Sequence, residues 1–304
     1  MIGPAHVLGR RSRAHAAAVR AATEALLNCY MREYGGWHVV PAGEVPDLAQ
    51  PGDTHLAVLP IAELHSTLLA GVRYLSPTSR HRFRLPAQLA VDGGEPRVAS
   101  LATVAELLVR PLGACAGATG ADPAALLARI DASVGAVATF LAAREDEVDA
   151  LWSAAPLSFL DSEQALLLGH MLHPTPKSRS EMSDAALRAF SPETAARFQL
   201  HWLAVQAGLV EHDSATGTPA PRLAESLLRD DPAVDEAALD AALAGLGERV
   251  LIPAHPWELA HLREHDAVVG ALLADGAIVD LGPLGRPVAA TTSLRTVCHP
   301  DWPW

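Results

Sequence analysis

"HRFRLPAQLAVDGGEPRVASL", residues 81–101, is the stretch that decides the fold class, because strand-like sequence ends within it and helical sequence begins after it. Its apolar runs are interrupted at Asp92, Gly93 and Gly94, residue types that favour tight turns. Two strand-like runs separated by such a turn predict a β-hairpin.

Strand-like sequence also precedes this hairpin. The runs "WHVVPA" at 37–42 and "HLAVLPI" at 55–61 are short and rich in branched apolar residues, as is typical of strands. Further upstream, residues 13–33 place alanine and apolar residues at helical spacing, and a pair of glycines follows shortly after them. We therefore predict a small mixed α/β lobe over residues 1–98.

Helical patterns dominate the chain after this lobe. Asp122 is a good N-cap, and Pro123 suits the first helical position. One apolar stripe follows, made of Leu127, Ile130, Val134, Val137, Leu141, Val148 and Leu151. A further helix is expected over residues 161–168. It would end at Gly169, a residue suited to the left-handed position after a helix.

The chain is rich in alanine and poor in aromatic residues, which indicates many helices packed through small side chains. We predict an α+β fold, in which residues 99–304 form a helix-rich domain with an antiparallel sheet. This domain is expected to carry the functional residues.

The charge balance limits the possible partners. A net charge of -12 argues against nucleic acid and anionic membranes, so an anionic ligand would need a local positive patch. The cysteines at 29, 115 and 298 form no CxxC pair, which favours a reducing compartment, and we expect the cytoplasm. No uncharged apolar run approaches the roughly 20 residues that span a bilayer.

"GHMLHPTPKSR", residues 169–179, holds the only lysine of the chain. Because prolines follow His173 and Thr175, this segment is expected to be extended, with alternate side chains on one face. His173, Thr175, Lys177 and Arg179 would then form a cradle for phosphate. The alternative is a solvated loop with ordinary surface charge. The retained lysine favours a tight anion site, where an ammonium cannot be exchanged for a guanidinium.

"ERVLIPAHPWELAHLREH", residues 248–265, reads as a strand to Pro253 followed by a helix that Pro256 begins. The N-terminus of such a helix favours an anion. The simpler interpretation is that His255 caps the helix and Trp257 packs against it.

"RPVAATTSLRTV", residues 286–297, reads as a strand. Thr291, Ser293 and Arg295 would share one face, and Thr296 would face the other way unless the strand bulges. This arrangement would place hydroxyl groups and a guanidinium on a rigid support.

Taken in order, four segments resemble the IucA/IucC-type synthetases, the NRPS-independent siderophore synthetases. The segments are "GHMLHPTPKSR", "FSPETAARFQLHWLAV", "IPAHPWEL" and "TTSLRTV", and the resemblance covers at least residues 157–298. It implies a fold like a cupped hand, with ATP in a cleft. It also implies ATP-dependent activation of a polycarboxylate such as citrate as its acyl-adenylate, followed by condensation with an amine or alcohol.

The resemblance also implies which residues bind ATP, with Mg²⁺ expected beside it. The matching positions are His170, His173 and Lys177 in the first segment and Ser293, Arg295 and Thr296 in the second. Lys177 and Arg295 would act in catalysis by spreading the charge that develops on the phosphates. His255 and Trp257 match an HPW element that would shape the cleft.

The sequence departs from the family pattern at Met171, where members usually have proline, and at Ser180 and Glu181, where a glycine is usual nearby. It ends at "CHPDWPW", whereas members are considerably longer. We therefore expect a truncated form of the fold. We also expect a homodimer or a complementing C-terminal half as partner, because an exposed sheet edge promotes association.

Two other classes of function are open at this point. A zinc hydrolase could use the histidines at 170 and 173 or those at 261 and 265, but no H-E-x-x-H or cysteine cluster completes either set, so no metal site is predicted. The second alternative is a noncatalytic half-synthetase that acts as a nucleotide-binding or assembly module.

Overall fold

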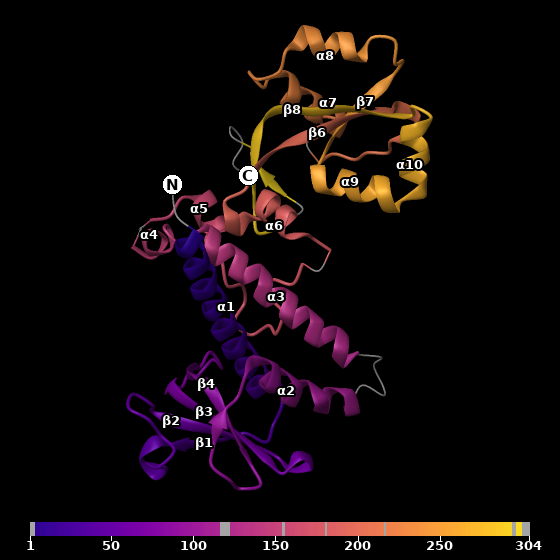
Figure 1. Ribbon diagram of the computed structural model, residues 1–304. Helices are drawn as coiled ribbons and strands as arrows, with labels where there is room; N and C mark the ends of the chain where they lie inside the picture. The colour runs from indigo at the N-terminus through magenta and orange to yellow at the C-terminus, as the bar shows by residue number, and fades with distance from the viewer. Residues whose placement is uncertain are drawn as a thin grey trace. The chain divides into compact units, whose positions relative to one another are not determined.

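The structure is a computed structural model that describes residues 4–115, 122–153, 156–179, 181–215, 217–293 and 296–299. The chain divides into two compact units (Figure 1). The first unit comprises Met1–Ser153 and Leu166–Leu187, and the second unit comprises Ala154–Ala165 and Arg188–Trp304. Each unit contains an antiparallel sheet with helices, which confirms the predicted α+β class.

The first unit consists of an antiparallel sheet and four helices among its described residues. The helices are α1 (Pro4–Glu33), α2 (Leu101–Cys115), α3 (Pro123–Ala143) and α4 (Val148–Ser153). The strands are β1 (His38–Pro41), β2 (His55–Ile61), β3 (Ser66–Tyr74), β4 (Arg82–Val91) and β5 (Arg97–Val98), with short 3-10 turns η1 (Ala42–Glu44) and η2 (Ala62–Leu64).

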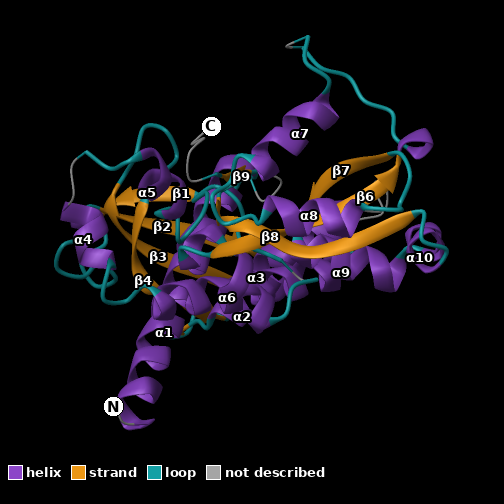
Figure 2. Cartoon of the chain, turned by 90° about the horizontal axis from the view of Figure 1, so that it is seen from above, coloured by secondary structure: helices purple, strands orange, loops and turns teal. Residues whose placement is uncertain are grey.

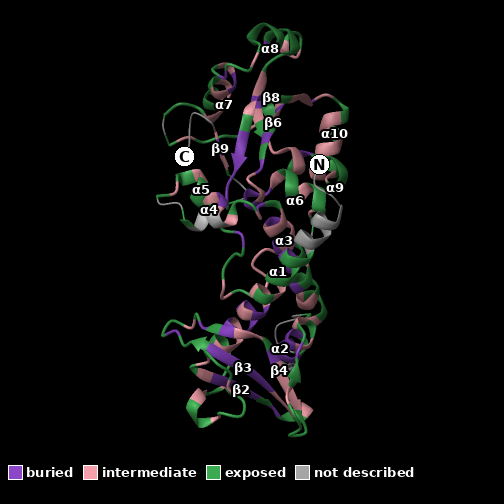
Figure 3. Ribbon diagram, turned by 60° about the vertical axis from the view of Figure 1, so that its left-hand side comes forward, coloured by how far each residue is buried: buried purple, intermediate pink, exposed green. Residues whose placement is uncertain are grey.

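The strands of this sheet follow one another in sequence order, β1 to β5, and each pairs antiparallel with the next. The hairpin predicted between β4 and β5 is confirmed. Asp92 has φ 50° and Gly93 has φ 69°, and Gly94 N donates to Val91 O at 2.9 Å. Strand β3 was not predicted, yet it is the central strand and its middle residues are buried (Figure 3).

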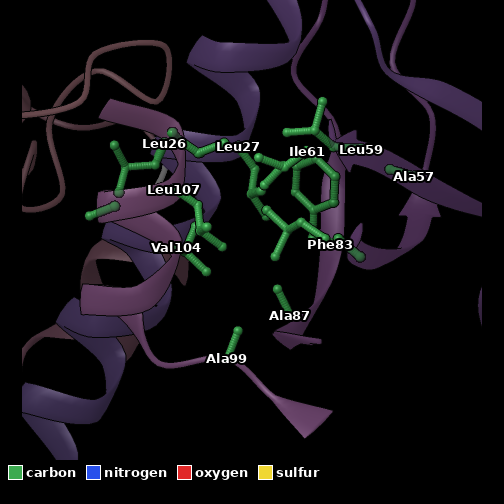
Figure 4. Packing of buried hydrophobic residues seen from close by; sticks show 14 of the residues in the cluster. Leu26, Leu27, Ala57, Leu59, Ile61, Phe83, Ala87, Ala99, Val104 and Leu107 are labelled. Atoms are coloured by element: carbon green, nitrogen blue, oxygen red, sulfur yellow. The ribbon is translucent and has the colours of Figure 1, made fainter. Parts of the chain in front are cut away.

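One face of the sheet packs on helices α1 and α2. Leu27 of α1, Phe83 of β4 and Val104 of α2 belong to one buried cluster (Figure 4). Helices α1 and α3 pack together through Ala18 and Val134. Helices α2 and α3 thus share a core with the first sheet. This grouping differs from the predicted boundary at residue 98, because the apolar faces of α2 and α3 are buried within the first unit.

Helix α3 begins as predicted, with the Asp122 side chain accepting a hydrogen bond from Ala124 N at 2.9 Å. The predicted apolar stripe is divided, because Val148 lies in the separate helix α4. By length and composition α3 is apolar enough to cross a membrane, which is weak support for a membrane span. Its buried residues, among them Val134 and Phe140, pack inside the first unit.

The second unit also combines helices with an antiparallel sheet, whose strand order is β7-β6-β8-β9. Its strands are β6 (Arg197–Gln206), β7 (Arg249–Ala254), β8 (Ile278–Ala290) and β9 (Val297–Cys298). Its helical segments are α5 (Phe159–Gln164), α6 (Asp184–Phe190, within which the division between the units falls), η4 (Pro192–Thr194), η5 (Ala207–Leu209), α7 (Ala220–Arg229), α8 (Glu236–Leu243), α9 (Pro256–His265) and α10 (Ala267–Ala274).

Strand β8 runs beside β6 along most of its length (Figure 2), but the pairing shifts register twice. At one shift Asp280 Oδ1 accepts a hydrogen bond from Gly282 N at 2.8 Å, and at the other Asp231 Oδ2 accepts one from Arg286 N at 2.9 Å. Each carboxylate therefore accepts a hydrogen bond from a main-chain N–H that the β-bulge leaves without a partner on the neighbouring strand.

Candidate nucleotide-binding segments

The segment at 169–179 is a series of turns. His173 N donates to His170 O at 3.1 Å, and Ser178 N donates to Thr175 O at 3.3 Å. The prediction of an extended rail is therefore wrong. The prolines do prevent a helix, but the backbone closes turns that histidine side chains support, so alternate residues do not share a face.

His170 and His173 each accept a main-chain hydrogen bond at Nδ1. The donors are Leu172 N at 3.2 Å and Thr175 N at 3.1 Å. A ring nitrogen that accepts carries no proton, so in the neutral ring the proton lies on Nε2; this tautomer is assigned from the hydrogen bond. Both residues are exposed, so each could donate a hydrogen bond from Nε2–H to an anion.

Lys177 is held through its backbone and its stem. Its main-chain N donates to the hydroxyl of buried Ser133 on α3 at 3.1 Å. A Cβ atom at Gly169 would lie 3.0 Å from Lys177 Cε and 2.7 Å from Pro176 Cβ, so the lysine stem crosses the bare Cα of Gly169. Nearby, the Arg179 guanidinium lies 5.3 Å from the centre of the Phe140 ring. These contacts do not fit the alternative of a fully solvated loop.

Gly169 has φ 78°, the left-handed conformation expected for it. The helix that was predicted to precede it directly is shorter than expected, because α5 ends at Gln164. Gly169 therefore serves the close approach of the lysine stem and does not cap a helix.

The second predicted segment forms the turn of a hairpin. Strand β8 ends at Ala290, and β9 returns beside it with Ala290 opposite Val297. The prediction that Thr291 and Ser293 share a strand face is therefore wrong, because the strand stops before them. Arg295 lies outside the described residues.

The Thr291 side chain joins the two ends of this loop. Its buried hydroxyl lies 2.9 Å from Thr296 O and 2.9 Å from Thr296 Oγ1. Since the Thr291 hydroxyl proton is donated to the carbonyl, the Thr296 hydroxyl must donate to Thr291 Oγ1. Thr296 then has no proton left for a phosphate oxygen. Ser293 is exposed, and its hydroxyl has no partner among the residues that the structure describes.

Sequence reasoning missed the support that α5 gives to this loop. Glu163 Oε2 accepts hydrogen bonds from Thr292 N at 3.0 Å and from Thr292 Oγ1 at 2.5 Å. The buried side chain of Gln164 donates to Ala290 O at 3.0 Å. Both contacts join residues far apart in the chain, so no local pattern could have indicated them.

The HPW element has the structural role given by the simpler interpretation. His255 Nδ1 accepts a hydrogen bond from Trp257 N at 3.1 Å and thereby caps α9. Its ring packs against Phe198 at 4.4 Å between ring centres, and burial lowers the pKa of His255 below its ordinary value. Trp257 stacks on His261 at 5.1 Å.

The second unit also contains a cavity of about 280 Å³ that was not predicted from the sequence. Its walls are mainly apolar, with Trp202 and Leu228 among them, and Asp231, Arg286 and His299 line it as well. Burial would raise the pKa of Asp231, but hydrogen bonds from Arg286 N and Ala233 N and the nearby guanidinium lower that pKa overall. Asp231 is therefore ionised at neutral pH.

The described parts of the chain contain no group of at least three His, Cys, Asp or Glu side chains that could hold a metal ion. The predicted site residues that the structure describes are divided between the two units: His170, His173 and Lys177 lie in turns of the first unit, and Ser293 and Thr296 lie in the hairpin loop of the second. The chemistry available at both places is hydrogen-bond donation to an anion.

Comparison with known proteins identifies relatives of this chain. Residues 158–304 match the IucA / IucC family. The rhizobactin siderophore biosynthesis protein RhbC of Rhizobium meliloti (strain 1021) is 34% identical over 279 residues, which are 91% of this chain and 44% of that protein. The spermidine-citrate ligase of Bacillus anthracis is 30% identical over 293 residues, which are 93% of this chain and 48% of that protein.

Among solved structures, ATP-bound aerobactin synthetase IucA from a hypervirulent pathotype of Klebsiella pneumoniae matches with a TM-score of 0.76 and 27% identity, over 91% of this chain and 46% of that chain. The chain spans about half the length of the curated relatives that it matches. The matched residues 158–304 contain all the segments that carried the resemblance. Residues 158–304 of this chain therefore carry an IucA / IucC family domain.

Proposed function

We propose that this chain supplies nucleotide-binding residues of a cytoplasmic siderophore synthetase that activates a citrate-like carboxylate with ATP and joins it to an amine or alcohol. The observation that carries the proposal is the family match over residues 158–304, which contains both candidate segments. Similarity to an ATP-bound synthetase and to a spermidine-citrate ligase supports the nucleotide and the substrate class.

In the proposed reaction a citrate carboxylate oxygen attacks the α-phosphorus of ATP, and the bond to pyrophosphate breaks. The amine or hydroxyl nucleophile then attacks the carbonyl carbon, loses its proton, and displaces AMP. No group in these steps changes oxidation state. The protein's main contribution is to hold the reactants and to stabilise the charge on the phosphates.

Lys177 would act in this step as a compact positive charge, with Nε2–H of His170 and His173 and the Ser293 hydroxyl as further donors. Arg295 remains a proposed second cation. Thr296 is proposed in a different role from the one predicted, because its hydroxyl bonds to the Thr291 hydroxyl. Thr296 would shape the loop.

Mg²⁺ would supply further charge neutralisation beside the triphosphate when bound. Mg²⁺ at sites of this kind usually binds through substrate phosphates, water and one or two carboxylates. Lys177, His170, His173 and Ser293 would bind the phosphates, and the phosphates would bind the Mg²⁺ ion. The proposed protein partner is a second copy of the chain or a complementing C-terminal half.

The proposal is tested by ATP–pyrophosphate exchange with citrate, succinate derivatives and 2-oxoglutarate, using the 304-residue chain and a version extended by any adjoining coding sequence. We expect the chain alone to bind nucleotide and the extended protein to catalyse exchange that depends on a carboxylate. Nucleotide binding without carboxylate-dependent exchange in either protein would support the noncatalytic module instead. Absence of nucleotide binding would refute both.

A further inference from the structure

We propose that Glu163, assisted by Gln164, is a positioning residue for the start of the hairpin loop after β8, residues 291–293. The inference rests on the proposed function, because it gives these side chains the task of presenting the loop to phosphate. Both residues lie at the C-terminal end of α5, and neither belongs to the segments that carried the family resemblance.

Glu163 fixes the loop directly after its first residue. One carboxylate oxygen accepts both the main-chain N–H of Thr292, at 3.0 Å, and its hydroxyl, at 2.5 Å. Hydrogen bonds to a charged acceptor are stronger than those between neutral groups. Because two donors from one residue converge on one oxygen, both the backbone and the side chain of Thr292 are constrained.

Gln164 fixes the residue before the loop. It donates from Nε2 to Ala290 O at 3.0 Å, and it is buried, so this bond is shielded from water. Neighbouring side chains on α5 therefore hold the chain on both sides of Thr291. This two-point attachment sets where β8 ends and how the loop leaves it.

Thr291 completes the arrangement from inside the loop. Its hydroxyl bonds to Thr296 O at 2.9 Å, and Thr296 N donates to Ser293 O at 3.0 Å. These contacts use the polar groups that face inward and leave the Ser293 hydroxyl exposed. The loop is thus held at its start by α5 and closed across its ends by Thr291, so that Ser293 is presented in a fixed position.

Helix α5 has only 6 residues, capped by Ser158, and a helix this short is marginal by itself. The Glu163 carboxylate is negatively charged, so it would not bind a phosphate directly. Its contacts with Thr292 direct one carboxylate oxygen into the protein's own hydrogen bonds, so the role that fits is positioning and not ligand contact.

The test compares Glu163→Ala, Glu163→Gln and the control Ser162→Ala in the full chain. Gln keeps an amide oxygen that can accept from both the Thr292 N–H and the Thr292 hydroxyl, whereas Ala removes both contacts. Ser162 is the preceding residue, and among the residues that the structure describes its hydroxyl bonds only to Ser158 O, one helical turn earlier. ATP affinity, amide hydrogen exchange at residues 292–298 and the urea unfolding midpoint are measured for each variant.

We expect Glu163→Ala to accelerate amide exchange in the loop by about tenfold or more and to raise the Kd for ATP by about fivefold or more, as the loss of charge-assisted hydrogen bonds implies. Glu163→Gln should restore both values to within about threefold, and Ser162→Ala should change neither. The unfolding midpoint reports whether the alanine variant is folded.

Several results would overturn the inference. Unchanged loop exchange in folded Glu163→Ala would show that the contact does not fix the loop. Faster exchange with unchanged ATP affinity would show that fixing the loop does not serve the nucleotide. If the unmodified chain binds no ATP, the proposed function fails, and loop exchange alone then decides whether Glu163 holds the loop.

Discussion

Replacing Gly169 by alanine should displace the segment that carries Lys177. The added Cβ would lie 2.7 Å from Pro176 Cβ, 3.0 Å from Lys177 Cε and 3.3 Å from Lys177 Cγ. Separations below 3.0 Å between such atoms force a shift, and the Pro176 ring is stiff. The new methyl group would therefore push on the residues that position the ammonium.

The magnitude has two parts. Gly169 has φ 78°, and an L-residue in this conformation costs roughly 1–2 kcal/mol. Crowding against a packed neighbour costs typically a further ~1–3 kcal/mol. We therefore expect a total of about 2–5 kcal/mol. The segment consists of turns and can move, so part of this cost should appear as weaker nucleotide binding and not as lower stability.

Substitutions at two other glycines distinguish the cost of backbone strain from the cost of crowding. Gly245 has φ 81°, and a methyl group added there would meet nothing within 4 Å, so Gly245→Ala tests backbone strain alone. Gly208 also has open space and no positive φ, so Gly208→Ala should be nearly neutral. Urea unfolding and ATP titration are measured for all three variants. If Gly169→Ala loses no more ATP affinity and no more stability than Gly245→Ala, the crowding argument is refuted.

Two other predictions concern the stability of the molecule. Gly71→Ala should destabilise the first sheet by about 3 kcal/mol in urea unfolding. A Cβ there would lie 2.6 Å from Asp53 Oδ2 and 2.8 Å from Arg84 Nη2 and would force apart a buried ion pair. An unchanged urea midpoint would contradict this prediction. Burial lowers the pKa of His81 and His255 from 6.5, so the unfolded state binds protons first and stability should fall as pH drops below about 6.5. A flat urea midpoint between about pH 7.5 and pH 5 would contradict that expectation.

Local sequence chemistry predicted several features correctly. Asp122 and His255 cap their helices as expected, since N-capping depends on side-chain oxygen or nitrogen atoms only a few residues from their partners. Strand β2 matches the predicted run over 55–61, and the Asp92 turn joins β4 to β5. These features depend on neighbours in sequence, and so the sequence pattern was sufficient.

The features that sequence reasoning missed depend on contacts between distant residues. Thr291 and Ser293 leave the strand because β8 turns back to pair with β9, and this turn is held by Glu163, 129 residues before Thr292. Likewise, Lys177 is fixed by Ser133 of α3. Alternation along the chain cannot reveal partners of this kind. The segments that carried the family resemblance lie within the matched residues 158–304, but the resemblance did not indicate their backbone conformations.

The central claim is that both candidate segments bind the phosphates of a nucleotide. It is tested most directly by titrating ATP, ADP and AMP into the chain and into Lys177→Ala, Lys177→Arg and Ser293→Ala. Arg222→Ala, which removes an exposed cation of α7, serves as the control.

We expect Lys177→Ala to weaken ATP binding by roughly 1.5–3 kcal/mol, with a smaller loss for ADP and the smallest for AMP, because the lost interaction is with the phosphates. Lys177→Arg should not fully restore the affinity, since a guanidinium differs in shape and hydration from an ammonium. Ser293→Ala should show the same dependence on phosphate number, and Arg222→Ala should show none. Equal losses for ATP and AMP, or unchanged ATP affinity in both Lys177→Ala and Ser293→Ala, would contradict the claim.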